Sequence, residues 1–492
     1  MLRGRYSMSP MEKFVEAIIN FPKVLGNGIV SFFKAIGHGI ASFFKAIANF
    51  FMIIIRGDFR TKLTFIIMGF GSFTRKQFIR GLIFLGIQVG YIYYMISFGW
   101  GYLQNITTLG TATRKKVWNA ELEIFEYIQG DNSMKILLFG VVTIVITLAF
   151  LFIYVSSIKS SYKAQLDRKA GKKLPTFKED VVSLLDSRFH ISMLSIPTIM
   201  VVAFTILPII FMICIAFTNF DKAHQPPANL FTWVGFDNFN EMFLDDPLQT
   251  STLWKVFSWT MIWAVFATLT NYIFGMILAM IINRKGIKCK SMWRTIFVIT
   301  IAVPQFVTLL LMSKIFADQG PLNAMLMNLG LITENIPFLT NPALAKVVII
   351  LVNMWVGIPH TMLITTGILL NIPEEMYESA KIDGAKPFKM FTKITLPYML
   401  FVTTPYLITQ FVGNINNFNV IFLLTGGGPV SLDYYQAGQT DLLVTWLYKL
   451  TVNEQNYNVA STIGIFVFVV TAVLSLFAYN MSSSTRKEDQ FQ

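Results

Sequence analysis

The sequence predicts an all-α fold, a polytopic transmembrane helical bundle with about eight spans. Of the 492 residues, 54% are hydrophobic and only 14% are charged, whereas a soluble chain would carry about 25% charged residues. The charges lie between apolar runs, several of which reach the roughly 20 residues that cross a bilayer. The predicted spans lie near 78–98, 136–156, 192–217, 256–282, 295–316, 344–368, 398–424 and 458–479.

The residues before the first span form a different kind of segment. The sequence Ser-Phe-Phe-Lys-Ala-Ile occurs at 31–36 and again at 42–47. A period of eleven residues is close to three helical turns, so both copies share one face. This apolar stripe, with lysines away from it, predicts an amphipathic helix on the membrane surface; a partner-binding or packed helix is the alternative. We therefore expect 1–77 to be a cytoplasmic or interfacial segment, in which 63–73 is too short to span.

The distribution of Lys and Arg predicts the orientation of the spans. Loops 157–190 and 283–294 are rich in these residues, whereas 218–253 is mainly acidic. Because cytoplasmic loops collect positive charge, both termini are predicted to be cytoplasmic, including a tail at 483–492. The basic cluster at 114–116, in a loop predicted to lie outside, is the exception. Cytoplasmic loops also account for the net charge of +13 better than nucleic-acid binding does.

The spans contain almost no ionisable residues near their centres. Ion-coupled carriers tend to use such residues, and a charged substrate would require a countercharge. The sequence contains no GxxxxGK[ST] phosphate-binding loop and no nucleophile–base arrangement. Cys214 and Cys289 form no CxxC pair, which argues against a disulfide framework and a zinc site. We expect a protein that is not an enzyme and has no metal site and no cofactor of its own.

The stretch 371–397 carries the most information about function. Asn371 is expected to cap a helix that has Pro373 in its first turn. Gly384 permits the chain to turn after this helix. Pro387 opens a second short helix, and Pro397 marks the start of the next span. A capped helix–turn–helix unit on the cytoplasmic side has a suitable shape for docking into another protein.

The residue pattern of this stretch resembles the EAA loop of ABC importer permeases. Glu378-x-Ala380 is followed by Gly384 and then by Ile394-x-Leu396-Pro397, with Ser379 where the family usually has Ala. The resemblance implies a type I ABC importer fold, in which this loop is the coupling helix that sits in a cleft of the ATPase. The implied ATPase-coupling residues are Glu378, Ala380, Gly384, Ile394, Leu396 and Pro397.

The runs 414–429 and 437–444 resemble the larger permease subunit of maltose and maltodextrin importers, the MalF type. The similarity extends over roughly 190–480 and implies a permease core at 191–482. The segment 78–190 would then supply two preceding spans and a basic cytoplasmic loop. The family's large external domain is missing, because only about 35 residues occupy 218–253.

Polar residues and glycines in two spans indicate a site for a neutral sugar. Each set follows the spacing i, i+3, i+4, i+7, which places it on one helix face. Amides donate to and accept from sugar hydroxyls without adding charge; the alternative is that they join helices to one another. By the resemblance, these positions form the family's sugar site, with His360 in place of a Tyr and Gly413 in place of a Phe. The candidate substrate-binding residues are Asn353, Val356, Gly357, His360, Gln410, Gly413, Asn414 and Asn417.

The predicted function is the transmembrane permease subunit of an ATP-binding-cassette importer for oligosaccharides, of the maltose or maltodextrin kind. The resemblance implies a heterodimer with a second permease subunit in the lipid of the cell membrane. It also implies two ATPase subunits that use ATP and Mg²⁺, and an extracellular sugar-binding protein; no nucleic-acid partner is expected. A stand-alone secondary sugar carrier, a permease for another neutral solute and a non-transporting scaffold are the alternatives. Co-purification with an ATPase would favour the importer over the carrier and the scaffold.

The charge asymmetry generates a test of topology. Residues 157–190 and 371–397 are predicted to be cytoplasmic, and 425–457 external. A cysteine introduced by Lys172→Cys should therefore resist an impermeant thiol reagent added outside intact cells. Labelling at this position would overturn the predicted topology.

Overall fold

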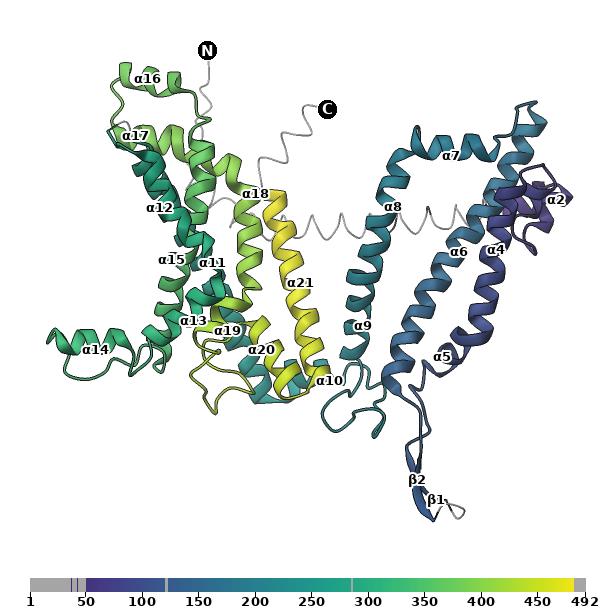
Figure 1. Ribbon diagram of the computed structural model, residues 1–492, viewed down its shortest axis with the longest axis horizontal. Helices are drawn as coiled ribbons and strands as arrows, with labels where there is room; N and C mark the ends of the chain where they lie inside the picture. The colour runs from purple at the N-terminus through teal and green to yellow at the C-terminus, as the bar shows by residue number, and fades with distance from the viewer. Residues whose placement is uncertain (1–36, 38–41, 43–49, 120–122, 285, 482–492) are drawn as a thin grey trace. The chain divides into compact units, whose positions relative to one another are not determined.

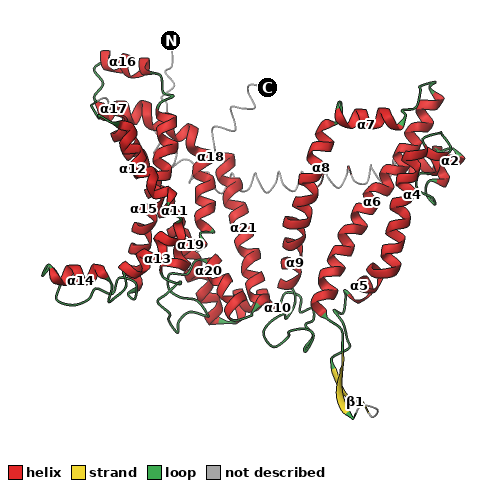
Figure 2. Cartoon of the chain, viewed as in Figure 1, coloured by secondary structure: helices red, strands yellow, loops and turns green. Residues whose placement is uncertain are grey.

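The computed structural model describes residues 37, 42, 50–119, 123–284 and 286–481. By packing, the chain divides between Gly235 and Phe236 into an N-terminal unit and a C-terminal unit. Helices dominate both, and the only strands in the described part form one hairpin, as Figure 2 shows. The predicted amphipathic helix with its repeat and the tail at 483–492 lie outside the described residues.

The N-terminal unit contains three long helical segments (Figure 1). The first passes through α4 (Phe78–Tyr94), a π-helical turn (Met95–Gly99) and α5 (Trp100–Asn105). The second is α6 (Ser133–Lys169). The third passes through α8 (Phe189–Val201), a π-helical turn (Val202–Ile206) and α9 (Leu207–Ala216). The shorter helices are α2 (Phe59–Leu63), α3 (Phe70–Phe73) and α7 (Phe177–Leu185), which joins α6 to α8.

A hairpin between α5 and α6 was not predicted from the sequence. Strand β1 (Lys115–Asn119) pairs antiparallel with β2 (Ile124–Ile128) at the end of the unit opposite α7 (Figure 1). The guanidinium of Arg114 lies 4.0 Å from the ring centroid of Tyr127, and the ammonium of Lys116 lies 4.4 Å from that of Phe125. These cation–π contacts stabilise two of the three basic side chains that stood out in the predicted external loop.

A buried polar network fixes α2 and α3 to α6. The Arg75 side chain, 1% exposed, pairs with Asp58 at 2.7 Å and donates to the hydroxyls of Thr61 and Ser161, each at 2.9 Å. Burial raises the pKa of Asp58, but the hydrogen bonds from Thr61 and Arg75 lower this pKa by more. The Gln165 side chain accepts from the backbone N–H of Asp58 at 2.9 Å. The short apolar run at 63–73 is therefore anchored by polar contacts.

The C-terminal unit is built around α11 (Pro247–Asn283) and α15 (Pro342–Leu369), which pack along each other (Figure 1). Before α11 come α10 (Asp237–Asn240) and a π-helical turn (Glu241–Asp245). Between α11 and α15 come α12 (Lys290–Ala302), α13 (Gln305–Ile315) and α14 (Pro321–Asn328). After α15 come α16 (Glu374–Ile382), α17 (Pro387–Met390), a π-helical turn (Phe391–Thr395), α18 (Leu396–Ile415), α19 (Phe418–Leu424), α20 (Leu443–Tyr448), a π-helical turn (Lys449–Asn453) and α21 (Tyr457–Met481).

The described residues contain six helical segments long and apolar enough to cross a membrane, or up to eight if each of two bent pairs is one span. These correspond to the eight predicted spans. The bent pairs are α12 with α13, at 85°, and Pro387–Ile415 with α19, at 40°. The predicted spans at 295–316 and 398–424 are therefore broken helices. The third span packs in the N-terminal unit, whereas the sequence grouped it with the core from 191 onwards.

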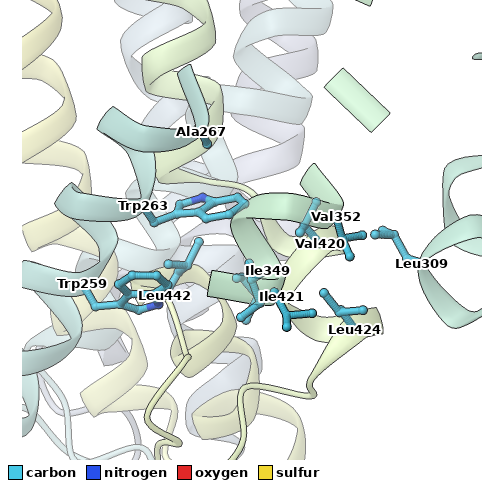
Figure 3. Close-up of a cluster of buried hydrophobic side chains, with 11 residues drawn as sticks. Trp259, Trp263, Ala267, Leu309, Ile349, Val352, Val420, Ile421, Leu424 and Leu442 are labelled. Atoms are coloured by element: carbon cyan, nitrogen blue, oxygen red, sulfur yellow. The ribbon is translucent and has the colours of Figure 1, made fainter. Parts of the chain in front are cut away.

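One hydrophobic cluster holds the short halves of both bent pairs (Figure 3). Its buried members come from α11, α13, α15, α19 and the chain before α20. Because α13 and α19 share this cluster, the two helix breaks are held in one region of the unit. The members drawn and labelled are Trp259, Trp263, Ala267, Leu309, Ile349, Val352, Val420, Ile421, Leu424 and Leu442.

Side-chain hydrogen bonds stabilise the chain on both sides of the second break. The indole of Trp263 donates to the carbonyl of Asn414 at 3.0 Å. The amide of Asn414 donates to the hydroxyl of Thr268, also at 3.0 Å. The Oδ1 of Asn417 accepts from the backbone N–H of Val420 at 3.3 Å and so caps α19. A helix can break within a membrane when such partners replace the lost helical bonds.

The polar network around Arg75 generates a stability prediction. Arg75→Ala removes the cation from Asp58 and the donors from two buried hydroxyls. Because the Asp58 side chain is 38% exposed, we expect a loss of roughly 1–3 kcal/mol rather than the larger cost of a fully buried pair. Thermal unfolding of the full chain in detergent measures this loss, with Arg56→Ala at an exposed position as the control. Equal effects of the two substitutions would show that the network does not stabilise this region.

Candidate functional site

A cavity of about 340 Å³ lies beside both helix breaks of the C-terminal unit. The break between α12 and α13 contributes Pro304 and Gln305, and the break between α18 and α19 contributes Asn414 and Asn417. Irregular backbone at membrane depth is expected where it is buried in protein or lines a cavity. The volume lies in the usual range of small-molecule sites. The two breaks therefore mark a candidate binding site.

The structure brings together seven of the eight candidate substrate-binding residues at this cavity. Gly413 does not line it and lies on an exposed side of α18. The single helix face predicted for 410, 413, 414 and 417 is wrong, because α18 ends at Ile415 and Asn417 begins the next helix. The seven residues at the cavity are Asn353, Val356, Gly357, His360, Gln410, Asn414 and Asn417.

The lining of the cavity is polar but carries no fixed charge. None of the described residues that line it is Asp, Glu, Lys or Arg. Its amides, hydroxyls and the His360 imidazole supply both donors and acceptors. Trp355 and Tyr406 add aromatic rings, and Trp355 is 58% exposed. This set suits a neutral ligand rich in hydroxyl groups and supplies no countercharge for an ionic one.

Two buried amide atoms at the cavity have no hydrogen-bond partner among the described residues. They are the Nδ2 of Asn353, which is 5% exposed, and the Oδ1 of Asn271. Gly357 allows α15 to approach Asn271 closely, since a Cβ at this glycine would lie 2.2 Å from the Nδ2 of Asn271. An unpaired buried polar atom costs about 1–3 kcal/mol. A ligand that hydrogen-bonds to these atoms would recover that cost.

Sequence reasoning missed several residues that line the cavity. The hydroxyl of Tyr406 lies 3.5 Å from the Nδ1 of His360 and 3.3 Å from the hydroxyl of Thr361. Tyr406 lies four residues before Gln410, so the same helical spacing extended by one turn would have included it. Asn271 stood out as an amide inside an apolar run. Gln305 carried the same signal, since it is an amide within the apolar predicted span 295–316, whereas Trp355 carried none.

The predicted coupling loop lies at one end of the C-terminal unit, away from α13 and α19 (Figure 1). Gly384 follows α16 with a φ of +71°, which agrees with the predicted sharp turn. The expected cap is wrong: Asn371 donates its backbone N–H to the carbonyl of Ile368 at 3.0 Å, after α15 has ended. Pro373 occupies the N-cap position of α16 instead.

The remaining coupling residues divide between α16 and the helix that follows it. Glu378 is exposed and Ala380 half-buried on α16. The half-buried Ile394, Leu396 and Pro397 lie on the continuous helix 387–415, which also carries Gln410. The two parts are joined by a hydrogen bond of 2.9 Å between the hydroxyls of Tyr377 and Thr395. The predicted coupling loop and the cavity are thus linked through one helix.

Comparisons with known proteins identify what the chain is similar to. Residues 271–487 match the family described as binding-protein-dependent transport system inner membrane component. The chain is 34% identical over 430 residues to the galactooligosaccharides transport system permease protein GanP of Bacillus subtilis, covering 86% of this chain and 97% of that protein. It is 33% identical over 436 residues to the maltodextrin transport system permease protein MdxF of the same organism, covering 86% and 95%.

A solved structure supports the fold. A chain in the crystal structure of a bacterial alginate ABC transporter, in complex with an alginate pentasaccharide-bound periplasmic protein, is 24% identical to this chain with a TM-score of 0.50. The match covers 61% of this chain and 96% of that one.

The cavity generates a prediction for Gln410, whose side chain has no hydrogen-bond partner among the described residues and which lines the cavity. Gln410→Ala should raise the substrate concentration that half-saturates uptake by about five- to hundred-fold, from roughly 1–3 kcal/mol for one lost hydrogen bond. Asn417→Ala is a less specific test because it also removes the cap of α19. Thr409→Ala, on the exposed side of the same helix, is the matched control. Wild-type uptake by Gln410→Ala at limiting substrate would place the ligand elsewhere.

Proposed function

The chain belongs to the family of inner membrane components of binding-protein-dependent transport systems, and we propose that it carries neutral oligosaccharides of the galactooligosaccharide or maltodextrin class. As a sugar permease of an ATP-binding-cassette importer, it is a multi-pass membrane protein. The observation that carries the substrate proposal is the uncharged cavity lined by amides and aromatic rings at two helix breaks. The names of its Bacillus subtilis relatives support the same class of substrate.

We propose that the helix 387–415 transmits movement between an ATPase and the sugar. Gln410 lies 23 residues after Pro387, or about 35 Å along a helix at 1.5 Å per residue. Movement of α16 would reach this helix through the Tyr377–Thr395 hydrogen bond and would tilt the cavity wall. ATP supplies the difference in free energy between inward-open and outward-open states. The chain itself binds no nucleotide in this scheme.

The surface of the coupling loop fits a docking role. Ile382 is 87% exposed and Phe388 is 77% exposed, one on each side of the Gly384 turn. Large apolar side chains so exposed outside the spans suggest a protein contact. We propose that they enter a cleft of the ATPase subunit. The complete importer would contain a second permease subunit, two ATPase subunits that use ATP and Mg²⁺, and an external sugar-binding protein.

Substitution of Gly384 tests the coupling role. A Cβ there would meet no atom within 4 Å, so a substitution acts through the backbone rather than through a clash. Gly384→Val should cost roughly 1–2 kcal/mol in the left-handed conformation and displace α16. We expect normal assembly with the second permease, weak ATPase binding and loss of sugar-stimulated ATP hydrolysis.

Gly384→Asn is the matched control, because Asn tolerates the left-handed region better than Val does. It should retain most ATPase binding and uptake. A Gly384→Val complex with wild-type ATPase binding and transport would show that this loop is not the coupling element.

A further inference from the structure

We propose that a basic cleft in the N-terminal unit binds the phosphate headgroup of an anionic phospholipid. The cleft has a volume of about 650 Å³ and is bounded by the start of α4, the C-terminal part of α6 and α7. Figure 1 shows α7 lying across the end of α6 and leading into α8. The sugar cavity belongs to the other unit, so the cleft has no part in the substrate site described above.

Positive charge predominates in the cleft. Its basic residues are Arg80, Lys159, Lys163 and Arg188, against the acidic Asp167 and Asp180. Asp180 pairs with Arg80 and is thereby neutralised. Within the described residues, no ion pair involves either lysine or Arg188. Lys159 and Lys163 lie four residues apart on one face of α6. Three unpaired cations and the carboxylate of Asp167 therefore face the cleft, and its four basic and two acidic residues leave a net charge of +2 beside a space large enough for a phosphate group.

The other side of the cleft is apolar. Ile83 and Phe84 come from α4, and Phe177, Val181 and Leu184 come from α7. A free phosphate ion would gain nothing from contact with these apolar side chains, whereas the glycerol and acyl portions of a lipid would pack against them. The combination of cations and apolar side chains therefore favours a phospholipid over a soluble phosphate.

The cleft lies at the level expected for lipid headgroups. The apolar run of α6 ends near residue 156, so Lys159 and Lys163 lie about one and two turns beyond it. On α7, Val182 is 51% and Leu185 is 69% exposed, which is typical of a helix lying in the membrane interface. Basic pockets between spans at this depth attract anionic headgroups. A bound phosphate would join α6 to the start of α8.

The test measures lipid binding to the full chain purified in detergent. Native mass spectrometry should show tighter binding of phosphatidylglycerol than of phosphatidylcholine with the same acyl chains. In the triple variant Lys159→Gln/Lys163→Gln/Arg188→Gln, the preference for phosphatidylglycerol should fall by on the order of 100-fold, because each cation contributes roughly fivefold. Lys163→Gln alone, at an exposed position, should weaken binding about fivefold. Equal binding of the two lipids by the wild type would overturn the proposal.

Two controls separate the cleft from other sources of binding. Lys169→Gln/Lys172→Gln/Lys173→Gln removes the same charge from the same basic segment at exposed positions that do not line the cleft. This control variant should keep the preference for phosphatidylglycerol. A loss as large as that of the first triple variant would show that the basic surface attracts the lipid in general, and it would overturn the proposed cleft site. Thermal stabilisation by inorganic phosphate as large as that by phosphatidylglycerol would assign the cleft to a soluble phosphate and overturn the lipid proposal.

Discussion

The hydrogen bond from the Trp263 indole to the Asn414 carbonyl allows α18 to end inside the membrane-spanning region. Carbonyl groups at a helix end lack intrahelical partners, and lipid offers none. The backbone N–H of Asn417 donates to the same Asn414 carbonyl at 3.2 Å, and with both partners in place the chain turns at Asn416 and begins α19. The hydrophobic cluster then packs α19 against α13, the short half of the other broken helix. The cavity is the space that the two breaks leave beside them.

The site combines rigid walls with incompletely satisfied polar groups. Asn414 is bonded through both its carbonyl and its amide, whereas Asn353 and Asn271 each keep one buried atom without a partner in the described part of the chain. Such atoms cost stability, which is common where binding requires them. The walls include the far end of the helix that starts beside the predicted coupling loop. One helix, 387–415, therefore connects the predicted coupling loop to the cavity.

The features that the sequence predicted correctly depend on residues that are near one another in the chain. The spans follow from apolar length, and the turn at Gly384 follows from the need for a positive φ. Helical spacing along α15 and α18 placed six candidate residues at one cavity, and Asn417 lines the same cavity from the start of α19. The break at Asn416 was not predicted, although four asparagines cluster at 414–419, because their polar character alone also suits an unbroken span and the donor Trp263 lies 151 residues away in sequence. Asn371 was misplaced because capping preferences do not show where the preceding helix ends.

The central claim is that this chain forms a path for neutral oligosaccharides and couples it to ATP hydrolysis. The most direct measurement is ATP hydrolysis by the reconstituted importer with its binding protein, over a panel of oligosaccharides matched in length. The uncharged lining predicts stimulation by neutral gluco- or galacto-oligosaccharides and none by uronic-acid oligosaccharides. Equal stimulation by the charged sugars, or none by any neutral sugar, would contradict the account.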